Sequence, residues 1–137
     1  MSAVNFRIKQ LIELAEQALN TAQVNFEAGD FRATVNRSYY AIFYTSSAML
    51  LTIGEERRKH SGVINAFRNH FVKPGLIEAE YSHIYGEILA TREDADYAIE
   101  IPINADAAEL ALDQARRFVQ RMSEYLVERG FWDETTE

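Results

Sequence analysis

The sequence predicts an all-α protein that folds as an up-and-down bundle of four or five helices, and two observations predict it. First, apolar residues recur at the helical period in several long segments. Second, no run alternates polar and apolar residues for long enough to form a sheet. The chain contains two prolines and six glycines, and most of these residues fall between the periodic segments. They predict short connections between neighbouring helices.

Each expected helix has a recognisable start or end. The first four helices cover about residues 4–28, 30–53, 61–72 and 77–94. The fifth helix is capped by Asn104 or Asp106 and reaches about residue 129. Ser61 is the expected N-cap of the third helix. The connection before the fifth helix is expected to be non-helical and to end at residues 101–103. The apolar face of the first helix is expected to contain Phe6, Leu11, Leu14, Ala15, Ala18, Leu19 and Ala22.

Length and composition indicate a single domain in a reducing compartment. The 137 residues fit one helical domain over residues 1–130, followed by a flexible acidic tail over 131–137. The absence of cysteine excludes disulfides and thiolate metal sites, which fits the cytoplasm. The N-terminus does not resemble a signal peptide, and the uncharged run 38–54 is too short and too polar to span a bilayer. We therefore expect a cytoplasmic protein with no membrane partner.

The second expected helix differs from an ordinary surface helix, because it has no charged face from Ser38 to Ile53. Such a helix must be covered nearly all round. The other helices and a second subunit could supply that cover, which predicts a symmetric homodimer. The alternative is a central helix wrapped entirely by its own chain.

The net charge of −7 argues against broad affinity for nucleic acid, because phosphate binding requires a local positive field. The distribution of charge matters more than the sum. Residues 57–73 contain five lysines and arginines and no acidic residue. They form either a basic surface for RNA or a set of ordinary solvated charges.

Arg37 and Tyr40 begin the uncharged helix and are candidates for RNA or nucleotide binding. At helical spacing Arg37 lies below Tyr40 and Tyr44. A buried arginine needs a partner, such as Asp96 or a helix C-terminus. Arg37 therefore either binds phosphate in a cleft or clamps two helices together.

Arg92 continues the inward row of the fourth expected helix, after Tyr81, Tyr85, Ile88 and Leu89. Asp96 and Tyr97 follow one turn later, in a segment expected to leave the helix. An arginine can stabilise negative charge that develops on phosphoryl oxygens, so Arg92 is a candidate catalytic residue, with Asp96 and Tyr97 as candidate binding residues. The alternative is a structural Arg92–Asp96 ion pair that closes the end of the bundle.

His60 is the second candidate catalytic residue, because it precedes the start of a helix, where backbone N–H groups attract anions. It could equally be an ordinary surface histidine. Glu80 and His83 have a Glu-x-x-His spacing used in di-iron bundles, but one such motif is too few for that site, and Tyr81 on the inward row turns His83 away. No metal site and no cofactor are predicted.

Three ordered motifs resemble the HEPN family of small bacterial and archaeal proteins. They are Arg37 to Tyr44, Lys59-His60-Ser61-Gly62-Val63, and Arg92 with Ala95-Asp96-Tyr97. The resemblance covers about residues 6–126 and implies a helical bundle, commonly a homodimer with a cleft between its subunits. It also implies a toxin-like module that acts on RNA without metal, often beside a minimal nucleotidyltransferase that acts as antitoxin.

The chain departs from the family in one respect. HEPN ribonucleases carry an arginine followed by a histidine after four to six residues, and no arginine here has a histidine at that spacing. Tyr97 stands where that histidine is expected after Arg92, so only His60 remains to assist attack by a 2′-hydroxyl, and only if the fold brings it near Arg92.

Three functions therefore stay open. The first is a toxin-like RNA binder or ribonuclease. The second is a non-catalytic HEPN protein that binds a nucleotidyltransferase or a nucleotide, in which Tyr97 would be a plausible target for modification. The third is a structural helical dimer, in which Arg37 and Arg92 are buried and fully paired.

Overall fold

The fold is an all-α bundle, as the sequence predicts. A computed structural model describes residues 2–97 and 102–132, and within these ranges the chain forms helices and no strand. The elements in order are α1 (Ala3–Glu27), α2 (Phe31–Leu51), α3 (His60–Phe67), the π-helix η1 (Arg68–Val72), α4 (Ala79–Tyr97) and α5 (Ala105–Glu128). None of the described helices is long and apolar enough to cross a lipid bilayer.

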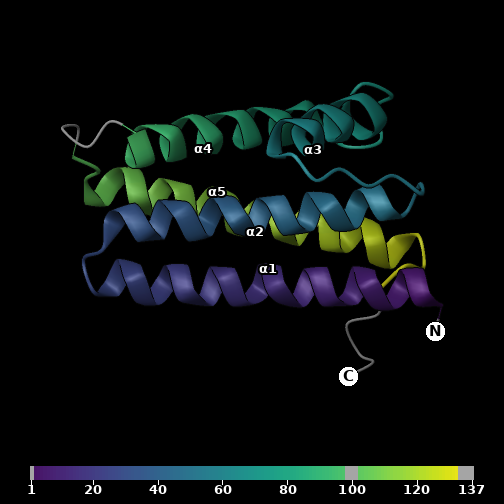
Figure 1. Cartoon of the computed structure of the whole chain (residues 1–137), viewed down its shortest axis with the longest axis horizontal. Coiled ribbons are helices and arrows are strands. Elements are labelled where there is room, and N and C mark those ends of the chain that lie inside the picture. Colours follow the sequence, from purple (N-terminus) through teal and green to yellow (C-terminus); the bar gives the residue numbers. More distant parts are fainter. Residues whose placement is uncertain (1, 98–101, 133–137) are drawn as a thin grey trace.

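α2 lies at the centre of the bundle (Figure 1). It runs antiparallel to α1 and contacts α1, α3, α4 and α5. The turn from α1 to α2 contains Gly29 with a φ of +78°, a left-handed conformation that glycine adopts without steric cost. The other helices of the chain therefore cover most of α2.

One side of α2 nevertheless remains partly exposed. The half-buried residues on this side, here called the α2 stripe, are Arg37, Tyr40, Phe43, Tyr44 and Ser47. The opposite sides are fully buried and include four hydroxyl side chains, Thr34, Ser38, Thr45 and Ser46. Three of the five residues of the α2 stripe are aromatic. Partly exposed aromatic groups of this kind mark binding surfaces, so the α2 stripe is a candidate ligand-binding face.

Among the described helices, α1, α2 and α5 each start at a residue whose side chain caps the helix. The Asp30 carboxylate accepts a hydrogen bond from the backbone N–H of Ala33 at 3.2 Å, at the start of α2. The Asn104 side chain accepts one from the N–H of Ala107 at 2.9 Å, which settles the choice between Asn104 and Asp106 as the cap of α5.

The predicted cap of α3 is wrong. Lys59 is the N-cap and makes no side-chain cap hydrogen bond, and Ser61 lies inside the helix. The helix starts one residue earlier, at His60, and the His60 ring packs against Phe43 of α2 with centroids 4.3 Å apart. α3 also continues as a π-helix, in which the N–H of Lys73 bonds to the carbonyl of Arg68, five residues earlier.

The predicted core face of α1 is partly wrong. Phe6 and Leu14 are 54% and 41% exposed, whereas Ile8, Ile12, Ala15, Ala18 and Ala22 are buried. The buried residues follow the 3.6-residue period from Ile8, and Phe6 and Leu14 lie off that line. α1 thus approaches α2 mainly through alanines, which allow the two helices to pack closely.

α4 is longer than predicted, and Asp96 and the backbone of Tyr97 belong to it. No glycine or proline interrupts the chain between Arg92 and Tyr97, and Ala95 is buried, so the helix continues through the segment expected to leave it. The inward row is confirmed, because Tyr81, Tyr85 and Ile88 are buried and Leu89 and Arg92 are half-buried. The side chain of Tyr97 lies outside the described residues.

The core is built around an aromatic cluster where α3, α4 and α5 meet. The rings of Phe67, Tyr85 and Phe118 are fully buried, with centroids 5.3–6.0 Å apart. Burial of each such ring stabilises the fold by about 1.5–3 kcal/mol. After α5, Phe131 and Trp132 are half-buried and pack against this core, whereas residues 133–137 of the predicted tail lie outside the described residues.

Candidate functional site

Tyr39 of α2 is the centre of the candidate site, although sequence analysis did not single it out. Its side chain is fully buried, and its ring contacts Arg92 of α4 and His60 of α3. Burial raises the pKa of Tyr39 to about 12, and the nearby Arg92 guanidinium opposes that shift. The phenol therefore keeps its proton at neutral pH and acts as a hydrogen-bonding group, not as a base.

Arg92 reaches from α4 onto α2. Its Cζ lies 4.7 Å from the ring centroid of Tyr39 and 5.6 Å from that of Tyr40, within the range of cation–π attraction. Its Nε is 3.4 Å from Asp96 Oδ2, in an ion pair one helical turn away. Nε is also buried and has no partner with good hydrogen-bond geometry among the described residues, so the ion pair leaves donor capacity unused.

His60 meets Arg92 at the ring of Tyr39. Its Nδ1 lies 2.9 Å from the Tyr39 hydroxyl, and its ring packs against Phe43. Burial, and then the positive charge of Arg92, lower the pKa of His60 below 6.5. The imidazole is therefore neutral at pH 7. The fold thus brings His60 near Arg92, which the sequence could not decide. The two residues are 32 positions apart in the chain, and both contact the ring of Tyr39.

Arg37 lies on the exposed edge of the same site. Its Cζ is 4.8 Å from the ring centroid of Tyr40, and its Nη2 donates a long hydrogen bond of 3.4 Å to Asn36. Its expected partner Asp96 pairs with Arg92 instead. Among the described side chains Arg37 contacts no carboxylate, so no interhelical clamp is seen at this position.

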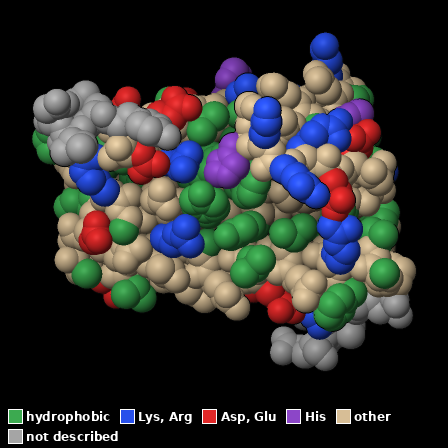
Figure 2. Space-filling view, in the orientation of Figure 1, with side chains coloured by type: hydrophobic (Ala, Val, Ile, Leu, Met, Phe, Trp, Pro, Cys, Tyr) green, Lys and Arg blue, Asp and Glu red, His purple; other side chains and the backbone are tan. Residues whose placement is uncertain are grey.

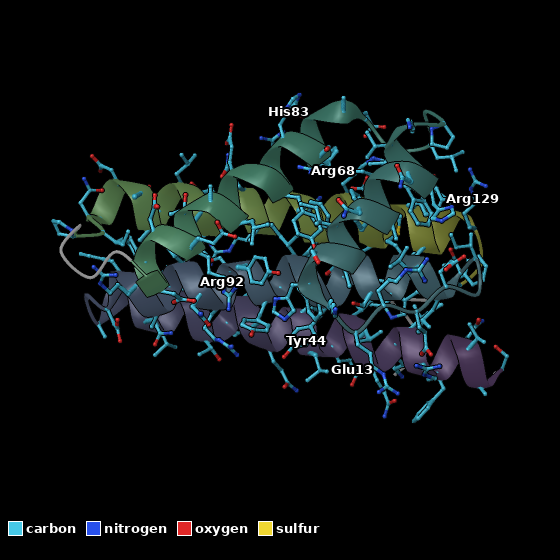
Figure 3. The ribbon with its side chains drawn as sticks, turned by 45° about the horizontal axis from the view of Figure 1, so that its top comes forward. Glu13, Tyr44, Arg68, His83, Arg92 and Arg129 are labelled. Atoms are coloured by element: carbon cyan, nitrogen blue, oxygen red, sulfur yellow. The ribbon has the colours of Figure 1, made fainter. Side chains whose placement is uncertain are left out.

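The face that carries these residues is apolar in the middle and basic at its borders (Figure 2). Hydrophobic side chains gather along α2, with lysine and arginine side chains on both sides. Figure 3 shows Arg92 projecting from α4 toward α2, on the same side of the bundle as Tyr44. The site is therefore an aromatic surface edged by cations, within a chain that is acidic as a whole.

The far end of the α2 stripe opens into a groove of about 630 Å³. Its floor is apolar, and its rim carries three arginines and one glutamate; the lining residues are Arg7, Leu11, Ser47, Leu50, Leu51, Glu56, Arg57 and Arg58. Arg7 pairs with Glu56, whereas Arg58 is exposed and makes no ion pair within the described part of the chain. The basic segment that begins at Arg57 thus contributes two of its arginines to the same face.

The Glu-x-x-His spacing has a structural explanation. Glu80 pairs with Arg117 of α5 at 2.8 Å, and His83 is exposed and points away from α2 (Figure 3). Within residues 2–97 and 102–132, no three histidine, aspartate or glutamate side chains gather closely enough to hold a metal ion.

Comparison with known proteins identifies the class. The chain belongs to the HEPN domain family, whose pattern matches residues 8–126. It is 40% identical over 121 residues to the protein named "Putative toxin MJ0605" of Methanocaldococcus jannaschii, covering 88% of this chain and 90% of that one. It is 31% identical over 123 residues to "Putative toxin MJ0142" of the same organism, covering 90% and 84%.

A solved structure confirms the fold. TT1696 from Thermus thermophilus superposes with a TM-score of 0.73, at 18% identity, over 86% of this chain and 97% of that one. The family model and the two relatives confirm the family that the three sequence motifs resemble, and the solved structure confirms the helical-bundle fold.

Proposed function

We propose that this chain is a toxin-like HEPN module that binds RNA at the face centred on Tyr39, as one subunit of a homodimer. The observation that carries the proposal is the meeting of Arg92 and His60 on one tyrosine ring, beside a partly exposed aromatic stripe. Arginine provides planar donors for phosphate, and exposed aromatic rings provide surfaces on which unpaired bases stack. The names of the two Methanocaldococcus relatives support the toxin-like part.

The geometry favours a single strand of RNA as the ligand. Tyr40, Phe43 and Tyr44 offer ring surfaces only to bases that are not paired within a duplex. Arg37 and Arg92 lie at one end of these rings, and Arg57 and Arg58 lie in the groove at the other. Arg37 and Ser47 are ten residues apart on α2, a rise of about 15 Å, which suits a few nucleotides of an extended strand.

Cleavage of the bound RNA is a second candidate function. Arg92 would stabilise the negative charge that develops on the phosphoryl oxygens, and His60 would assist attack by the 2′-hydroxyl, without metal. The proximity of both side chains to Tyr39 favours this candidate, and the missing family histidine disfavours it. Tyr97 remains a candidate binding residue at the end of α4, and Asp96 acts there through Arg92, with which it forms an ion pair.

The proposed partners follow from family membership. A homodimer would use the α2 stripe to line a cleft between subunits, and a minimal nucleotidyltransferase would bind as antitoxin. A non-catalytic HEPN protein that binds only this partner or a nucleotide is the alternative. A purely structural dimer is disfavoured, because it requires a fully paired Arg37, and Arg37 contacts no carboxylate among the described residues. Light scattering of the purified protein tests the dimer.

The proposal is tested by fluorescence anisotropy with a labelled single-stranded oligoribonucleotide, beside a metal-free cleavage assay on total RNA and tRNA. Loss of an arginine–phosphate contact weakens binding by about tenfold or more, and we expect this of Arg92→Ala. Arg129→Ala is the matched control, because Arg129 also lies 4.7 Å from a tyrosine ring centroid, that of Tyr125 on α5, and is far from Arg92 (Figure 3).

Three outcomes are distinguishable. Binding that weakens in Arg92→Ala but not in Arg129→Ala supports the RNA site. Cleavage that the wild type performs and Arg92→Ala loses establishes ribonuclease chemistry without the family histidine. A partner-free wild-type protein that neither binds nor cleaves RNA overturns the proposal and points to the nucleotidyltransferase as the ligand.

A further inference from the structure

The hydroxyl of Tyr39 is buried and has one hydrogen-bond partner among the described residues, the Nδ1 of His60 at 2.9 Å. A phenol carries a single hydrogen, and a buried donor that finds no acceptor is left both unpaired and without water. The neighbouring Arg92 guanidinium can only donate, so it offers the phenol hydrogen no alternative. The hydrogen of Tyr39 is therefore directed to Nδ1.

The protonation state of His60 follows from this contact. Tyr39 keeps its proton at neutral pH because burial raises its pKa to about 12, and His60 is neutral because burial and Arg92 lower its pKa. A neutral imidazole has one hydrogen, and when Nδ1 accepts the phenol hydrogen, that hydrogen must be on Nε2. The opposite arrangement, Nδ1–H donating to the phenol oxygen, leaves the buried phenol hydrogen without an acceptor.

We propose that Tyr39 is a positioning residue that fixes His60 as the Nε2–H tautomer, so that His60 and Arg92 present only hydrogen-bond donors to a phosphate oxygen. Nδ1 is taken up by the Tyr39 hydroxyl, so Nε2 is the nitrogen left for a ligand, and His60 is only partly buried. The identity of the phosphate as part of RNA rests on the proposed function. A donor-only site binds a phosphodiester but leaves His60 no basic nitrogen for a 2′-hydroxyl, so this inference favours RNA binding over the cleavage candidate.

The tautomer is measured by long-range proton–nitrogen correlation NMR on uniformly ¹⁵N-labelled protein, with His60 assigned from His70→Asn and His83→Asn variants. We expect Nδ1 of the neutral wild-type His60 to be unprotonated and hydrogen-bonded, and Nε2 to be protonated. In Tyr39→Phe, the ¹⁵N chemical shift of Nδ1 should move to the value of an unprotonated nitrogen that accepts no hydrogen bond. Tyr40→Phe is the matched control, because Tyr40 is the adjacent tyrosine and only its ring contacts His60. A protonated Nδ1 in the neutral wild type overturns the proposal.

The functional readout compares two substitutions of His60 in the anisotropy assay. A glutamine amide can place an N–H near the position of Nε2 but cannot act as a base. We expect His60→Gln to bind RNA within about threefold of the wild type, and His60→Ala to bind about tenfold more weakly. Equal losses in the two variants overturn the donor role. If the wild type binds no RNA, the proposed function fails, while the tautomer is still decided by NMR.

Discussion

Replacement of Asp96 by asparagine tests whether the Asp96 carboxylate competes with an RNA phosphate for Arg92. Asp96 Oδ2 lies 3.4 Å from Arg92 Nε, and the two side chains are 32% and 17% exposed. A phosphate that binds Arg92 must therefore approach a carboxylate already beside it. Asp96→Asn keeps the size and polarity of the side chain and removes the negative charge.

The size of the effect follows from the geometry. A phosphate oxygen that accepts a hydrogen bond from the guanidinium lies about 3 Å from its nitrogen, so the phosphate and carboxylate charges are about 6 Å apart. Two unit charges at that distance in water repel by about 0.7 kcal/mol, which is about threefold in Kd. We therefore expect Asp96→Asn to bind RNA about three times more tightly than the wild type.

The same substitution should leave stability nearly unchanged. A carboxylate in the last turn of a helix opposes the helix dipole and costs about 0.3–1 kcal/mol, whereas a partly exposed ion pair contributes about 0.3–0.5 kcal/mol. These effects nearly cancel for Asp96, which lies at the C-terminal end of α4. The free energy of unfolding in urea should therefore change by less than about 0.5 kcal/mol.

Asp94→Asn is the control for net charge. Asp94 is exposed, lies two residues away on α4, and makes no ion pair in the described part of the chain. Both variants change the net charge by the same amount, but only Asp96→Asn releases Arg92. If Asp96→Asn binds RNA no more tightly than Asp94→Asn at matched salt, then Asp96 does not compete with phosphate for Arg92 and the reasoning is wrong.

Two further predictions concern the support of the site. Alanine usually stabilises a helix by about 1 kcal/mol over glycine, but a Cβ at Gly86 would lie 2.8 Å from Arg68 Nη2 and disturb its hydrogen bonds to Ser82. We expect Gly86→Ala to stabilise an Arg68→Ala background by about 1 kcal/mol but to stabilise the wild type by less than about 0.5 kcal/mol, as measured in urea. The hydrogen bonds from Arg121 lower the pKa of Glu78 below 4.5, so this pair stabilises the fold above that pH and its contribution is lost as pH falls through the lowered value. Glu78→Gln should therefore lose less thermal stability than the wild type between about pH 5 and about pH 3.

Each of these two predictions has a clear contrary result. A Gly86→Ala variant that is stabilised equally in both backgrounds would mean that Arg68 moves aside at no cost. Parallel melting-temperature curves for the wild type and Glu78→Gln would mean that the pair with Arg121 contributes nothing to acid stability.

The sequence predicted the parts of the fold that depend on local chemistry. The expected helix bounds placed the turn between α1 and α2 at residue 29, and Asn104 was one of the two expected caps of α5. The inward row of α4 was also predictable, because its apolar residues follow the helical period up to Arg92. These features are decided within a few residues of chain, where propensity and capping operate.

The parts that depend on tertiary packing were not predictable. α2 has no charged face to orient it, so nothing in the sequence distinguishes the buried Tyr39 from the half-buried Tyr40 beside it. Phe6 is exposed because the alanines of α1, and not its largest side chain, decide the approach to α2. The candidate site itself depends on contacts between α2, α3 and α4 that no local pattern specifies.

That division of the site among three helices has a consequence for its lifetime. α1, α2 and α5 pack against one another, whereas α3, η1 and α4 lie together on one side of this group (Figure 1). Partial detachment of that side would carry His60 and Arg92 away from Tyr39 while the other three helices stayed folded. The site persists only as long as the α3–α4 segment stays docked, so amide exchange in α3 and α4 reports how often the protein is folded yet unable to bind.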